Sequence, residues 1–230
     1  MILRRATRQR YRALLAVLLA AAFGCATAAP PPLQPTTDAA WQAYQRGDYA
    51  AALAGYEAAG EKGNRLAQFN VAMMRLRGEG KPADVAVGVA WLNRAADAGF
   101  PQAQYQMGLL AESGIGMAKS LPTAAAWWQK AAEQGHTQAQ VELATAYFLG
   151  RGAPKDWKLA AKWYEAGAEG GDVGAQYIIG SFYEHGDGVP QDLKRALDWY
   201  TAAARQGDVG AAAQAKDVAR RLAGSGEAAH

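Results

Sequence analysis

Histidine, serine and cysteine are the residue types here that would first be examined for metal binding or nucleophilic catalysis. The histidines, at positions 136, 185 and 230, lack the short spacing to another histidine or cysteine that a zinc site requires. No serine begins an S-x-x-K motif or lies within G-x-S-x-G. Glu184, His185 and Asp187 stand close together in the sequence, but a solvated surface explains them better than a metal site.

Glycine pairs could suggest a phosphate-binding loop. Gly78-Glu79-Gly80 is the first of four such pairs, which return every 36 residues. A phosphate-binding loop follows a strand as G-x-G-x-x-G or carries G-K-[ST], and neither context is present. Tight turns between helices are therefore the favoured interpretation. These observations predict a chain without enzymatic activity, cofactor or metal.

A period of 36 residues organises most of the chain. The pair Ala-Gln stands at 67–68, 103–104, 139–140 and 175–176, and Ala-Ala follows at 211–212. Tryptophans, helix-capping residues and helix-ending glycines keep the same period. They are Trp91, Trp127, Trp163 and Trp199; Asp84, Ser120, Asp156 and Asp192; and Gly99, Gly135, Gly171 and Gly207. Each unit therefore predicts a first helix (the A helix), a glycine turn, an N-cap and a second helix (the B helix).

This pattern predicts an all-α fold, a right-handed α/α superhelical solenoid of helix-turn-helix repeats. One helix pair cannot bury its apolar face alone, so neighbouring pairs must stack. We expect the solenoid at 39–222 and a flexible tail at 223–230. Its units would be about 39–66, 67–102, 103–138, 139–174 and 175–210, with a capping helix at 211–222. The tryptophans would fill the core, and the A helices would line a concave face.

The unit 175–210 resembles the Sel1-like repeat, a relative of the tetratricopeptide repeat. The matching residues are Ala175, Gly180, Tyr183, Gly186, Gly188, Val189, Asp192, Ala196, Trp199, Tyr200, Ala203, Ala204 and Gly207. Other units depart from the pattern at Arg75, Ala111 and Ala153. The resemblance covers about residues 39–222 and implies a bacterial protein whose stacked helices bind another protein or peptide.

One face of the A helices combines accessibility with variable chemistry. Positions 4, 7 and 11 of each A helix share a face at about 100° per residue. We call these residues the A-helix stripe: Asn70, Met73, Arg77, Gln106, Leu109, Ser113, Glu142, Thr145, Leu149, Ile178, Ser181 and His185. Residue types change along the stripe while core positions barely change, as a recognition groove requires. Ordinary solvent exposure is the alternative explanation.

The N-terminus has the pattern of an export signal. Five arginines between Arg4 and Arg12 precede the apolar stretch 13–23 and the small residues of GCATAA. Residues 1–28 are predicted as a signal peptide, with cleavage after Ala28. Alternatively, AAFGC resembles a bacterial lipobox, which would place a lipid anchor on Cys25. Residues 29–38 are predicted as a proline-rich linker.

Charge argues against a nucleic-acid partner. The formal net charge is +3, but the five arginines of the leader account for +5, which leaves −2 for the remainder. We therefore expect a non-enzymatic scaffold in the periplasm, soluble or attached to the outer membrane through Cys25. It would bind a protein or peptide of the cell envelope. The alternatives are an envelope enzyme acting on peptidoglycan or β-lactams, and a glycan-binding module.

Overall fold

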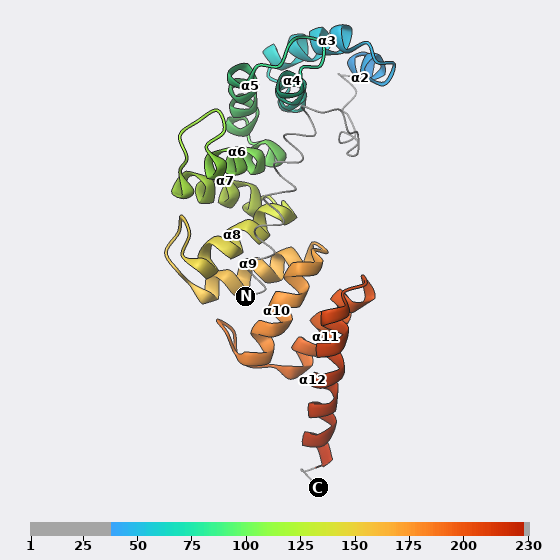
Figure 1. Cartoon of the computed structure of the whole chain (residues 1–230), viewed down its shortest axis with the longest axis vertical. Coiled ribbons are helices and arrows are strands. Elements are labelled where there is room, and N and C mark those ends of the chain that lie inside the picture. The colour runs from blue at the N-terminus through green and yellow to red at the C-terminus, as the bar shows by residue number, and fades with distance from the viewer. Residues whose placement is uncertain (1–37, 228–230) are drawn as a thin grey trace. The chain divides into compact units, whose positions relative to one another are not determined.

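The computed structural model describes residues 38–227, which form eleven α-helices and no strand (Figure 1). The predicted signal peptide, Cys25 and residues 29–37 of the linker lie outside the described residues. No helix within 38–227 is long and apolar enough to cross a membrane. The helices are α2 (Asp38–Gln45), α3 (Tyr49–Glu61), α4 (Arg65–Arg77), α5 (Val85–Asp97), α6 (Pro101–Ser113), α7 (Leu121–Glu133), α8 (Thr137–Leu149), α9 (Trp157–Glu169), α10 (Val173–His185), α11 (Leu193–Arg205) and α12 (Val209–Glu227).

The helices form two compact units that divide after Gly99. In the first unit α4 packs between α3 and α5, and α2 packs against α3. In the second unit the helices from α6 to α12 each pack against the next one along the chain. The all-α helix-turn-helix fold predicted from the period is confirmed. The final helix extends to Glu227, beyond the predicted end of the capping helix at residue 222.

Capping residues explain where the B helices begin. The predicted N-caps Asp84, Ser120, Asp156 and Asp192 each accept a hydrogen bond from a backbone N–H two or three residues further on, at 2.9–3.3 Å. These bonds satisfy amides that have no partner inside a helix. The predicted stop glycines, from Gly99 to Gly207, adopt positive φ values between 80° and 93°.

Within each unit, turns between an A helix and a B helix lie against the preceding B helix, at Gly80, Gly152 and Gly188. Gly188 shows why glycine is needed in this turn. Its φ is +72°, and a Cβ built on it would lie 2.2 Å from the carbonyl oxygen of Trp157, the first residue of α9. Gly152 has the same relation to Leu121, the first residue of α7. A side chain at either glycine would separate the turn from the helix that it contacts.

The core contains the residue that follows each tryptophan of the period. Leu92, Trp128, Tyr164 and Tyr200 occupy this position, and Tyr56 stands one period earlier, after Gly55; all five are between 1% and 4% exposed. Small residues make room for them, since a Cβ on Gly108 would lie 2.3 Å from the Trp128 ring. Within the second unit, Tyr164 and Tyr200 belong to one continuous cluster of buried residues.

The prediction that the periodic tryptophans fill the core is wrong. All four are only half-buried, and Trp91, Trp163 and Trp199 pack against the edge of a buried cluster. Cations cover three of the rings: Arg94 is 4.1 Å from the Trp91 centroid, Lys130 is 4.0 Å from Trp127, and Lys162 is 4.9 Å from Trp163. A ring face covered in this way is not free to stack on a sugar, which disfavours glycan binding there.

The periodic glutamines join successive repeats. Gln68, Gln140 and Gln176 are each at least nine-tenths buried. Their side-chain amides donate to the carbonyl oxygens of Gly60, Ala132 and Ala168, at 2.9, 3.3 and 3.1 Å. Each of these carbonyls lies in the last turn of the preceding B helix and also accepts a hydrogen bond from the amide of a stop glycine, at 2.9–3.0 Å. The Ala-Gln pair therefore marks a junction between repeats.

Candidate partner-binding surface

On the A helices α8 and α10 of the second unit, the stripe positions form an accessible line. In α8 this line comprises Glu142 and Thr145, which are half-buried, and Leu149, which is 42% exposed. In α10 it comprises Ile178 and Ser181, which are half-buried, and His185, which is exposed. These are the positions of the predicted stripe. The predicted face is therefore accessible on both helices.

The A-helix stripe is less accessible in the earlier repeats. Gln106 is half-buried and Ser113 is exposed in α6, but Leu109 between them is only 5% exposed. In α4, Met73 and Arg77 are half-buried, whereas Asn70 is 7% exposed. The prediction that Leu109 and Asn70 lie on an open face is therefore wrong. Helical periodicity gives the direction in which a side chain leaves its helix, but not how deeply neighbouring helices cover it.

Thr145 connects the stripe to the core. Its hydroxyl donates to the carbonyl of Val141 at 2.8 Å, so its oxygen accepts from the Tyr164 hydroxyl at 2.9 Å. Tyr164 is 1% exposed and belongs to the buried cluster of the second unit. The hydroxyl of Thr145 is therefore occupied within the fold. Leu149, one turn further along α8, is the large apolar residue of the stripe with the greatest exposure.

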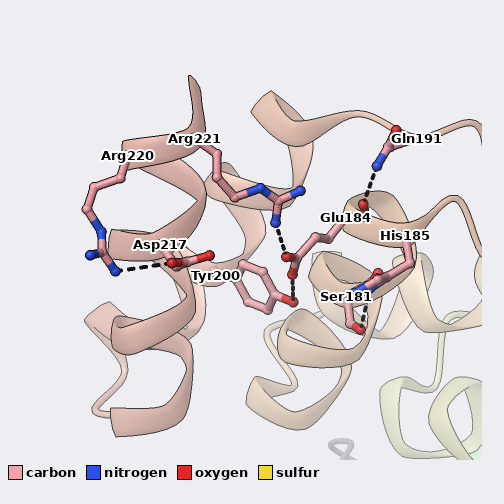
Figure 2. Close-up of polar contacts among 8 residues, drawn as sticks. All are labelled: Ser181, Glu184, His185, Gln191, Tyr200, Asp217, Arg220 and Arg221. Carbon is pink, nitrogen blue, oxygen red and sulfur yellow. Dashed lines mark hydrogen bonds and ion pairs between the residues drawn. The ribbon is translucent and has the colours of Figure 1, made fainter. Parts of the chain in front are cut away.

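A polar cluster lies where the stripe reaches the last two A-type helices, α10 and α12 (Figure 2). Glu184 of α10 is 7% exposed, and its carboxylate accepts a hydrogen bond from the Tyr200 hydroxyl at 2.8 Å. Arg221 of α12 forms an ion pair with the other oxygen of this carboxylate. Burial raises the pKa of Tyr200, and Glu184 adds to that shift. The hydroxyl therefore remains a proton donor to Glu184, which is stabilised by two partners.

Ser181 and His185 lie side by side on α10 but do not form a nucleophile and base. His185 Nδ1 is 2.9 Å from the Ser181 carbonyl oxygen, so it carries the proton that it donates there. Its distance to the Ser181 hydroxyl is longer, at 3.4 Å. A base must accept the proton of the nucleophile, and this nitrogen is already a donor. Within residues 38–227, no group of three His, Cys, Asp or Glu residues is arranged to hold a metal ion.

Helix α12 adds a fifth row to the stripe, outside the residues predicted above. Gln214, Asp217 and Arg221 of α12 stand 36 residues after Ile178, Ser181 and His185. Gln214 and Asp217 are half-buried, and Arg221 is exposed. The period itself contained the signal, since Ala211 continues the Ala-Gln register into α12. Predicting α12 as a cap alone leaves this row out of the stripe.

Comparisons with known proteins agree with the repeat architecture. A Sel1 repeat protein from Oxalobacter formigenes is 32% identical, with a TM-score of 0.72 over 77% of this chain and 73% of that protein. A protective antigen of uropathogenic Escherichia coli strains, which displays an SLR fold, is 32% identical, with a TM-score of 0.69; the match covers 74% of this chain and 38% of the antigen. No curated protein matches the sequence.

The family model named Sel1 repeat matches four consecutive segments, 65–100, 101–136, 137–172 and 173–208. Each segment begins at the first residue of an A helix: Arg65, Pro101, Thr137 or Val173. Its period is the 36 residues of the internal repeat. Together the four segments span more than half of the sequence, and the chain belongs to the Sel1 repeat family.

Proposed function

We propose that this chain is a non-enzymatic scaffold of the bacterial cell envelope that binds a protein or peptide along the A-helix stripe. Sel1 repeat proteins generally mediate protein–protein interaction. The observation that supports this site is the accessible line on α8 and α10. Its residue types differ between the two helices, while the buried positions beside it keep alanine and glutamine.

The chemistry of the stripe suits a short apolar segment with polar flanks. Leu149 and Ile178 supply apolar surface, and Glu142 and His185 supply charge and hydrogen-bonding groups beside it. Binding energy at such surfaces concentrates in a few central side chains. Because Leu109 is buried, the proposed anchor is Leu149. The fifth row on α12 extends the contact surface with Arg221.

The proposed location rests on the leader. The arginine-rich start, the apolar stretch 13–23 and the small residues after it favour export, and two processed forms remain open. Intact-mass measurement of the protein from producing cells distinguishes them. A chain beginning at Ala29 indicates a soluble form, and a lipid-modified Cys25 indicates an anchored one. A protein that retains residues 1–28 in the cytoplasm would contradict export.

Photo-crosslinking followed by an affinity measurement tests the binding site. A photoreactive residue at position 149 should capture the partner in producing cells, and the same residue at position 85 should not. Val85 is a suitable control because it is 45% exposed at the start of a B helix, outside the stripe. The captured protein would then be purified for binding measurements.

Leu149→Glu should weaken binding of that partner by roughly thirtyfold, which corresponds to about 2 kcal/mol for a central anchor. Val85→Glu should leave the affinity nearly unchanged. Both variants should keep their helix content by circular dichroism, because surface substitutions usually cost only about 0.5 kcal/mol. Equal effects of the two substitutions would place the binding site elsewhere.

A further inference from the structure

Within residues 38–227, helix α2 has one face against which no other repeat packs. In the described residues, α4 packs between α3 and α5, α8 between α7 and α9, and α10 between α9 and α11. An A helix is thus normally covered by its own B helix and by the preceding one. Helix α2, drawn in blue in Figure 1, has an extensive helix contact only with α3. The side where a preceding B helix would pack is therefore open among the described residues.

Three aromatic rings gather at this end of the first unit. Trp41 and Tyr44 stack with centroids 5.8 Å apart and planes 9° from parallel, and Tyr49 lies 5.1 Å from Tyr44. We call these three residues the N-terminal aromatic patch. Trp41 and Tyr44 are half-buried, and Tyr49 is 40% exposed. Accessible aromatic rings that lie together are suited to binding an apolar segment.

Contacts with the rest of the first unit hold the rings of the patch in place. Tyr44 packs against the buried cluster of the first unit, and its hydroxyl donates to Glu79 at 3.2 Å. Burial raises the pKa of Tyr44, and the Glu79 carboxylate adds to the shift, so this hydroxyl keeps its proton. Tyr49 is the first residue of α3, whose N-cap Asp48 accepts from the Ala51 amide at 3.1 Å. A ligand would therefore meet rings whose positions are already set.

The sequence directly before α2 has the composition that aromatic patches bind. Residues 29–37 read APPPLQPTT, with four prolines and no charged residue. Proline lacks a backbone N–H, so this segment cannot supply the B helix that is missing beside α2. Proline-rich segments instead dock on aromatic side chains as extended polyproline II helices, which lose little entropy on binding. Only a few residues separate Pro35 from Trp41.

We propose that residues 30–35 of the same chain bind the N-terminal aromatic patch and cap the first repeat. Covalent connection favours this occupant over a separate peptide, because a short tether gives an effective concentration in the millimolar range. The segment would be retained in both processed forms predicted for the leader. This inference concerns the end of the repeat array and is independent of the A-helix stripe.

Hydrogen exchange at the end of α2 tests the proposal on the processed protein. The Arg46 amide donates to the Gln42 carbonyl and the Asp48 amide to the Ala43 carbonyl, so both report on opening of α2. Replacing Pro30, Pro31, Pro32 and Pro35 by serine should accelerate their exchange roughly three- to tenfold, the range expected for losing aromatic contacts. Pro82→Ser, in an exposed turn of the same unit, should leave these rates unchanged.

A Trp41→Ala background separates docking from any other effect of the prolines. There the four serine substitutions should produce little further acceleration, because the aromatic surface is already reduced. Unchanged exchange at Arg46 and Asp48 on replacing the prolines in the parent protein would overturn the proposal. Protection that depends on protein concentration and not on the prolines would also overturn it, because it would identify a second copy of the chain as the occupant.

Discussion

Two adjacent aromatic residues of α9 allow a direct test of how the repeats are held together. Trp163 and Tyr164 belong to neighbouring positions of the period, but only Tyr164 is fully buried. We expect Tyr164→Ala to destabilise the protein much more than Trp163→Ala, although tryptophan is the larger residue. Tyr164→Phe isolates the contribution of the hydroxyl that bonds Thr145.

The expected magnitudes follow from burial. A buried tyrosine covers about 160 Å² of apolar surface, which at about 25 cal/mol per Å² corresponds to about 4 kcal/mol. Measured losses for buried aromatic residues replaced by alanine are similar, at roughly 3–5 kcal/mol. Trp163 is half-buried and should cost about 2 kcal/mol. Tyr164→Phe should cost about 1 kcal/mol, the usual net contribution of one hydrogen bond.

Urea denaturation followed by circular dichroism measures these differences, and thermal melting provides a second readout. For a folded region of this size, Tyr164→Ala should lower Tm by roughly 8–16 °C. Each repeat is stabilised by its neighbours, so the loss should also accelerate hydrogen exchange in α8 and α10. An equal or larger loss for Trp163→Ala would refute the assignment of the core to the second residue of the pair.

Three further predictions concern a turn, a cap and an ion pair. Gly188→Ala should destabilise the protein by several kcal/mol more than Gly171→Ala (urea denaturation), since both have positive φ but only Gly188 meets a backbone carbonyl. Burial lowers the pKa of His136. The stability that its neutral imidazole contributes is therefore complete above pH about 6.5 and is lost as the pH falls through the pKa of His136 in the folded protein. His136→Asn should remove this pH dependence, which a series of urea denaturations at different pH values would measure. Arg221→Met should lower the free energy of unfolding by about 1–2 kcal/mol, because the Glu184 carboxylate loses its ion pair. Adding Glu184→Gln to this variant should recover part of the loss, and a fully additive loss in the double variant would contradict the pairing.

The period predicts most of the fold because its signals are local. A carboxylate at Asp156 can reach amides two and three residues ahead whatever surrounds the helix. A glycine such as Gly171 adopts positive φ at little steric cost. These features fixed the start and the end of each helix within a few residues. The length of α12 was underestimated because its last residues contain glycines that suggest an end before Glu227.

The depth of burial was harder to predict, because it depends on helices that are distant in sequence. Trp163 and Tyr164 point about 100° apart around one helix, and the sequence does not show which direction meets the next helix. Tryptophan was assigned to the core by its size, whereas the smaller tyrosine occupies it. Leu109 was assigned to the stripe by its phase, and packing of the surrounding helices buries it.

The glutamine bonds between repeats have a consequence for how such a chain can change its length. Gln140 and Gln176 recognise backbone carbonyls, which every residue possesses, and not particular side chains of the preceding B helix. The polar part of the junction is therefore the same whichever repeat stands before it. A duplicated or deleted segment of 36 residues would reproduce this bond at its new boundary. An array built in this way can gain or lose whole modules without new polar partners having to arise at the same time.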